Sequence, residues 1–116
     1  MTRPELQALL FDIEGACELI ARFTSRKTLD DYRSDPMMRS AVERQLEIVG
    51  EALRAAAEIE PTLRAEITGL DQIVGLRNRL AHAYASIADE VIWGIVEGSL
   101  PLLRREVRTL VSASEA

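Results

Sequence analysis

Apolar residues recur at intervals of three and four along two long segments of the first half of the chain. This spacing is typical of one face of an amphipathic helix. It predicts one helix near the N-terminus and a second from Pro36 to about Ile59, which Pro61 should end. The apolar positions are Leu6, Leu9, Leu10, Ile13, Cys17, Ile20 and Phe23 in the first helix, and Met38, Val42, Leu46, Val49, Leu53 and Ala56 in the second.

The same spacing predicts two further helices in the second half of the chain. Asp71 is suited to cap a third helix, and Ser86 with Asp89 has the capping-box spacing that would open the last one. Pro101 lies inside the last apolar stripe and removes one backbone donor, so we expect a kink or a break there. The apolar positions are Ile73, Leu76, Leu80 and Ala83 in the third helix, and Ile92, Trp93, Val96, Leu100, Leu103, Val107 and Leu110 in the last.

The segments between these helices carry recognisable start signals. Thr2 and Glu5 have capping-box spacing, with Pro4 tolerated in the first turn, and Asp35 before Pro36 reads as a helix start. Short helical pieces are expected at residues 29–32 and 62–67.

No strand pattern, internal repeat or linker separates these elements, and 116 residues suffice for one domain but not two. The prediction is an all-α fold: a single domain, residues 1–116, forming an antiparallel bundle of four main helices plus a short helical piece. The extra apolar positions Ile48, Val91 and Ile95 suit a bundle that also packs against a second copy of itself. Packing inside one copy would account for them as well.

Charge and composition exclude several functions. Fourteen basic residues, of which only Lys27 is a lysine, stand against nineteen acidic ones, so the net charge is −5. A general nucleic-acid coat needs a basic surface, and only a local cluster of arginines would allow this chain to act on nucleic acid. The single Cys17 and single His82 exclude an intrachain disulfide and a cysteine- or histidine-rich metal site. With no signal peptide and no membrane-length apolar run, we expect a cytoplasmic protein without metal or cofactor.

The residues best suited to chemistry lie between Arg77 and Tyr84. If the third helix continues unbroken through them, His82 points away from the apolar side, with Asn78 one turn before it on nearly the same line. Arg79 flanks that line, while Arg77 and Tyr84 share another line at the edge of the core. An ordinary surface histidine on a solvated, arginine-rich face is the competing interpretation.

Other side chains are weaker candidates. Asp12 and Glu14 on the first helix, and Glu47 with Glu51 on the second, could reach the same cleft. The spacing of the second pair would also allow a metal, but two such carboxylates more often form a solvated face. Cys17 is expected to be inert packing, and Trp93 to be core rather than a platform for stacked bases.

Two stretches resemble a known family. Residues 39–52 (RSAVERQLEIVGEA) resemble the second helix of the HepT-like toxins, a branch of the HEPN superfamily of small helical ribonucleases and nucleotide binders. Residues 73–84 (IVGLRNRLAHAY) resemble the family signature, in which Arg, a polar residue and His are followed by x-Tyr, and residues 89–93 (DEVIW) resemble its final helix. Ala83 departs from the pattern, because many relatives carry an acidic residue there.

This resemblance implies a HEPN-like symmetric homodimer and a metal-independent endoribonuclease. His82 would act as general acid and base, Arg77 would stabilise the phosphoryl transition state, and Asn78 and Arg79 would bind substrate or support the site. One histidine per chain fits a composite cleft, since a dimer brings two copies of His82 together.

The resemblance also implies partners. It places the chain in a type VII-like toxin–antitoxin pair, where a minimal nucleotidyltransferase would neutralise it by attaching AMP to Tyr84. Two alternatives remain open: a catalytically silent module that binds a nucleotide or a protein, and a purely structural helical dimer.

Overall fold

The computed structural model describes residues 3–82 and 87–115, and all regular structure in these ranges is helical. The predicted all-α fold is therefore confirmed. The elements, in chain order, are α1 (Pro4–Thr24), α2 (Leu29–Ser34), α3 (Pro36–Ile59), α4 (Leu63–Glu66), α5 (Leu70–Ala81), α6 (Asp89–Gly94), the π-helical turn η1 (Ile95–Ser99) and α7 (Leu100–Glu115).

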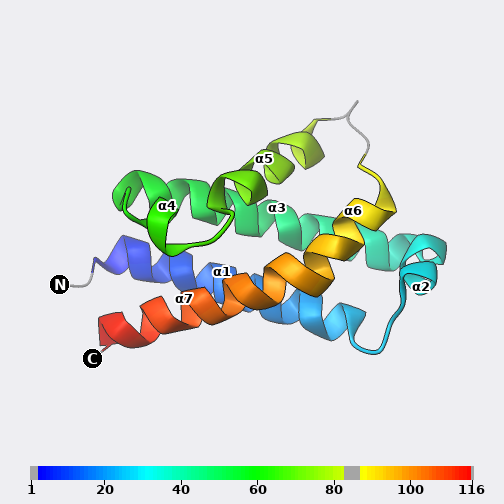
Figure 1. The fold of residues 1–116 in the computed structure, drawn as a ribbon, viewed down its shortest axis with the longest axis horizontal. Helices are drawn as coiled ribbons and strands as arrows, with labels where there is room; N and C mark the ends of the chain where they lie inside the picture. Colours follow the sequence, from blue (N-terminus) through cyan, green and yellow to red (C-terminus); the bar gives the residue numbers. More distant parts are fainter. Residues whose placement is uncertain (1–2, 83–86, 116) are drawn as a thin grey trace.

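The long helices run in alternating directions and lie side by side (Figure 1). Helix α3 packs against α1 on one side and α5 on the other, while α1 also packs against α7. Their apolar stripes meet in one continuous core, as the spacing predicts. Among the described residues of these stripes, Phe23 is the exception, because its side chain remains 36% exposed at the end of α1. None of the described helices has both the length and the apolar character needed to cross a membrane.

The predicted start of α3 is confirmed, and the predicted cap of α5 is wrong. Asp35 accepts a hydrogen bond from the backbone N–H of Met38 at 3.1 Å, which caps α3. Helix α5 is preceded by Gly69 at φ +70°, a left-handed conformation that suits glycine, and not by Asp71. Asp71 lies in the first turn, where it pairs with Arg64.

The other two predicted caps involve residues outside the described ranges. The residue preceding α1 is Arg3, whose side chain makes no capping bond, and Thr2 lies outside the described residues. Ser86 also lies outside them, and the residue preceding α6 is Ala88.

The irregularity expected at Pro101 is a change of helix type. Helices α6, η1 and α7 follow one another without a break, and the turn from Ile95 to Ser99 is π-helical (Figure 1). Pro101 has no N–H to donate to the preceding turn, which explains why regular α-helical bonding is lost just before it.

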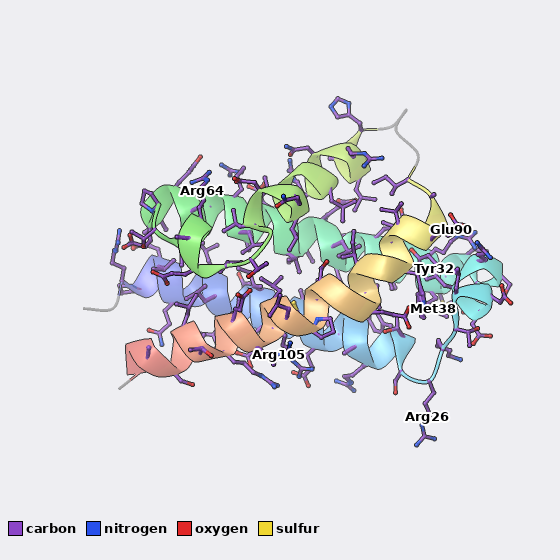
Figure 2. All side chains as sticks on the ribbon, in the orientation of Figure 1. Arg26, Tyr32, Met38, Arg64, Glu90 and Arg105 are labelled. Carbon is purple, nitrogen blue, oxygen red and sulfur yellow. The ribbon has the colours of Figure 1, made fainter. Side chains whose placement is uncertain are left out.

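A short helix closes one end of the bundle. Thr28 and Asp31 cap α2 reciprocally, and this helix packs on both α3 and α6. Tyr32 is fully buried there, with its ring 5.5 Å from that of Trp93. Arg33 forms an ion pair with Glu90, so Tyr32 and Glu90 lie together at this corner (Figure 2).

Candidate active site

Arg77 projects from α5 toward α3, where two neighbours hold its guanidinium. Its Nη2 lies 3.2 Å from Glu51 Oε2, and its Nη1 donates to Asn78 Oδ1 at 3.1 Å. An arginine has five N–H groups, so most of its donors remain available. Asn78 therefore contacts Arg77 and makes no hydrogen bond to His82 within the described structure.

Glu51 joins Arg77 to a second arginine. Arg54, one turn along α3, donates to Glu51 Oε1 at 2.6 Å. This hydrogen bond lowers the pKa of Glu51, and the positive charges of Arg54 and Arg77 lower it further. The carboxylate is therefore ionised at neutral pH and available to orient Arg77.

A cavity of about 340 Å³ opens beside Arg77, between α1, α3 and α5. The predicted candidates Asp12, Glu47 and Glu51 all line it, whereas Glu14 does not and instead binds Arg108 at 3.1 Å. Its lining residues are Leu9, Asp12, Arg44, Glu47, Ile48, Glu51, Ala52, Ala55 and Arg77.

Arg44 is a functional candidate that the sequence reading did not single out. It lies seven residues before Glu51, two turns away on the same face of α3. This spacing in the sequence places Arg44 on the same side of the helix as Glu51. It pairs with Glu47 at 3.5 Å. The cavity thus holds two guanidiniums and three carboxylates, so in a single chain it is not a basic site.

His82 is exposed, as predicted, but for a different reason. Helix α5 ends at Ala81, and His82 follows in an extended conformation (φ −86°, ψ 123°) with its N–H donating to the carbonyl of Arg79. The assumption of an unbroken helix to Tyr84 is wrong, so helical phase does not place His82. Its imidazole makes no hydrogen bond to any described residue.

The remaining signature residues are placed only in part. Arg79 is exposed in the last turn of α5 and forms no ion pair within the described ranges. Ala83 and Tyr84 lie outside the described residues, so the predicted alignment of Tyr84 with Arg77 stays a prediction.

The predictions that Cys17 is core packing and that Trp93 belongs to the core are both confirmed. Cys17 is 2% exposed, and burial raises the pKa of its thiol to about 12, with Arg104 acting in the opposite direction. Trp93 is 6% exposed and packs on Tyr32. Neither side chain is placed to act on a substrate in solution.

Comparison with known proteins gives consistent matches over nearly the whole chain. The family model described as "Ribonuclease HepT-like" matches residues 13–110. "Putative RNase MJ1380" of Methanocaldococcus jannaschii is 33% identical over 109 residues, covering 92% of this chain and 97% of that protein. "Probable ribonuclease HepT" of Thermococcus cleftensis is 34% identical over 101 residues, covering 87% of this chain and 91% of its own length. No solved structure matches.

Proposed function

The chain belongs to the HepT-like ribonuclease family, and we propose that it is a metal-independent endoribonuclease toxin that uses Arg77 and His82. The 2′-oxygen of a ribose would form a bond to the adjacent phosphorus while the bond from phosphorus to the 5′-oxygen breaks. The products are a cyclic phosphate and a free 5′-hydroxyl. This reaction needs a base for the 2′-hydroxyl, an acid for the leaving oxygen and a cation for the phosphoryl oxygens.

The observation that carries the proposal is the way Arg77 is held. Glu51 and Asn78 each engage one end of its guanidinium, so its orientation is fixed while other N–H groups stay free. A planar, pre-oriented fork is suited to two oxygens of one phosphate. Arg77 therefore supplies the cation, and Asn78 supports it.

His82 supplies the proton transfers. Histidine exchanges protons near neutral pH, and the exposed position of His82 just after α5 leaves both ring nitrogens accessible. One imidazole takes the proton of the 2′-hydroxyl, and a second gives a proton to the 5′-oxygen. Arg79, exposed beside it, contributes positive charge for binding the RNA chain.

A symmetric homodimer completes this site. Each chain has one histidine, so two imidazoles in one cleft require two chains. Carboxylates offset the arginines at the cavity of a single chain. Pairing of two chains would bring Arg77 and Arg79 of both to one groove. Val91 is 48% exposed and Ile48 half-buried, which leaves apolar surface for such contacts.

Regulation by a partner enzyme follows from the same motif. We propose that the chain acts in the cytoplasm as the toxin of a type VII-like toxin–antitoxin pair. A cognate minimal nucleotidyltransferase would attach AMP to Tyr84, and the added phosphate would compete for the arginines of the cleft.

The test is RNA cleavage by purified protein and two variants. His82→Ala should keep the helicity and mass of the wild-type assembly and lose cleavage, and expression of the wild type alone should arrest growth while this variant does not. Arg77→Lys should also be strongly impaired, because a point charge does not replace a two-pronged donor. Cleavage by well-folded His82→Ala protein would overturn the assignment. Binding of a nucleotide or protein without cleavage in the wild type would favour the silent module.

A further inference from the structure

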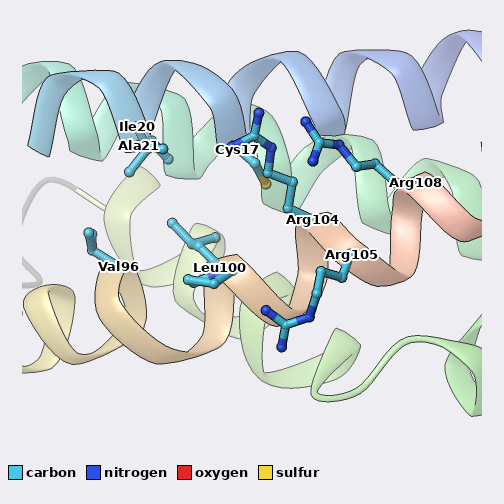
Figure 3. A pocket seen from close by; sticks show the side chains of 9 residues that line it. Cys17, Ile20, Ala21, Val96, Leu100, Arg104, Arg105 and Arg108 are labelled. Atoms are coloured by element: carbon cyan, nitrogen blue, oxygen red, sulfur yellow. The ribbon is translucent and has the colours of Figure 1, made fainter. Parts of the chain in front are cut away.

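A second cavity, of about 230 Å³, lies between α1 and the helix formed by α6, η1 and α7 (Figure 3). It shares no lining residue with the cavity at Arg77. Three arginines of α7 line one part of it, namely Arg104, Arg105 and Arg108. The other lining residues, all apolar apart from the thiol, are Cys17, Ile20, Ala21, Val96, Leu100 and Pro101.

Two of these three guanidiniums have no counter-charge in the described structure. The Nε of Arg104 is buried without a hydrogen-bond partner, and Arg105 forms no side-chain hydrogen bond or ion pair there. Only Arg108 is paired, with its Nε 3.1 Å from Glu14 Oε1 on α1. A buried donor without an acceptor costs free energy and calls for a partner that the chain itself does not supply.

The local excess of positive charge is unusual for this chain. Acidic residues outnumber basic ones by five, nineteen against fourteen, yet Glu14 is the one carboxylate that pairs with these arginines among the side chains that the structure describes. Arg104 and Arg108 lie four residues apart on α7, where like charges destabilise a helix. The thiol of Cys17 adds no negative charge, because burial keeps it protonated.

We propose that this cavity binds a doubly charged phosphate group, either inorganic phosphate or a phosphate monoester. Arg104 and Arg108 both point toward α1, whereas the exposed Arg105 points away from it (Figure 3), so Arg104 would hold the phosphate with Arg108 beside it. The planar fork of arginine fits phosphate oxygens. The small volume, which Leu100 and Ile20 also line, leaves room for little more than the phosphate and a small apolar or planar group. The π-helical turn η1, which contributes Val96, is a distortion often found at functional sites.

This site is independent of the proposed cleavage reaction. Its residues lie on α1, η1 and α7, and the proposed catalytic residues lie on and after α5. Phosphate binding at this cavity can therefore be measured directly. Its result does not depend on whether His82 takes part in RNA cleavage.

The experiment is a calorimetric titration of the full chain with inorganic phosphate, with AMP and with adenosine as separate probes. Wild-type protein should bind phosphate, and adenosine should not compete for the site. Equal affinities for phosphate and AMP would identify free phosphate as the ligand, and tighter binding of AMP would identify a monoester. Arg104→Gln should weaken phosphate binding by about tenfold or more, since it removes a doubly hydrogen-bonded charge.

The matched control is Arg26→Gln. Arg26 is an exposed arginine in the loop between α1 and α2 that does not line the cavity, and it lies well away from Arg105 (Figure 2). This variant should bind phosphate as the wild type does. Equal loss in both variants, or no saturable binding by the wild type, would overturn the proposal.

A second variant covers the case in which Arg104→Gln does not fold. Glu14→Gln keeps every arginine and releases Arg108 from its ion pair, so it should tighten phosphate binding several-fold. Unchanged or weaker binding by folded Glu14→Gln protein would contradict the site.

Discussion

A Cβ atom placed on Gly50 of α3 would lie 2.2 Å from the Cβ of Arg77 on α5. It would also lie 2.9 Å from Arg77 Cγ and 3.3 Å from the carbonyl oxygen of Ile73, so no side chain fits there without moving α5. The next residue along α3 is Glu51, which pairs with Arg77. Glycine at position 50 thus fixes how closely the proposed catalytic arginine approaches its carboxylate partner.

Replacing Gly50 by alanine should destabilise the fold and impair cleavage together. Forcing a methyl group into this contact should cost about 1–3 kcal/mol in the free energy of unfolding, measured with urea. The matched control is Gly15→Ala in α1, where nothing lies within 4 Å of the added Cβ. That change should stabilise the helix by about 0.5–1 kcal/mol. Wild-type stability and activity in Gly50→Ala would show that the close approach has no role.

Glu51→Gln tests whether the carboxylate positions Arg77. Loss of the charge removes the ion pair at 3.2 Å, so kcat for RNA cleavage should fall by about three- to tenfold with little change in KM. Glu58→Gln is the control, because Glu58 also pairs with Arg54 but not with Arg77. A faster enzyme after Glu51→Gln would mean that Glu51 competes with the substrate instead.

Mixed dimers test the requirement for two histidines. Wild-type protein is mixed with increasing amounts of His82→Ala protein under conditions that allow subunits to exchange. If both imidazoles act in one cleft, cleavage should follow the square of the wild-type fraction, because only wild-type pairs are active. A linear decrease would rule out the two-histidine mechanism.

Tyr84→Phe tests the proposed modification. Incubation of the wild type with ATP and the cognate nucleotidyltransferase should add the mass of AMP at Tyr84 and stop cleavage. The phenylalanine variant keeps the ring and loses the acceptor oxygen, so it should fold, retain much of its activity and resist neutralisation. Equal modification and inhibition of the variant would exclude Tyr84 as the acceptor.

Cys17 predicts a pH dependence of stability. Burial raises the pKa of its thiol to about 12, whereas a cysteine in an unfolded chain titrates near pH ~8.5. The contribution to stability is complete below the unfolded value and is lost as the pH rises toward 12. Between pH ~9 and ~10.5, urea unfolding should therefore show a steeper loss of stability for the wild type than for Cys17→Ala. Parallel curves would contradict this.

The helices could be predicted well because each has a distinct apolar stripe. The bounds Pro36–Ile59 follow from two prolines and an aspartate cap, and the structure confirms them. The end of α5 could not be predicted, because no glycine or proline follows Ala81 to mark it. The predicted direction of the His82 side chain therefore assumed helical geometry beyond Ala81, where the helix has already ended.

The site was predictable as a set of residue types but not as a set of contacts. The motif identified Arg77, and the family resemblance is confirmed by the matches over residues 13–110. The pairing of Arg77 with Glu51 depends on the distance between α3 and α5, which Gly50 sets. Likewise, the gathering of Arg104, Arg105 and Arg108 at one cavity depends on how α7 faces α1, which periodicity within one helix does not reveal.

The π-helical turn before Pro101 sets the rotational register of the last helix. A π turn contains about one residue more than an α turn, so the same residues in regular α-helix would rotate everything after Leu100 by about 100°. The face of α6 that packs on α2 and the face of α7 that packs on α1 are offset by that extra residue. Deleting one residue within Ile95–Ser99 would leave the α6 face on α2 and the α7 face on α1. A deletion in α7 between Leu100 and Arg108 would instead rotate Arg108 away from Glu14.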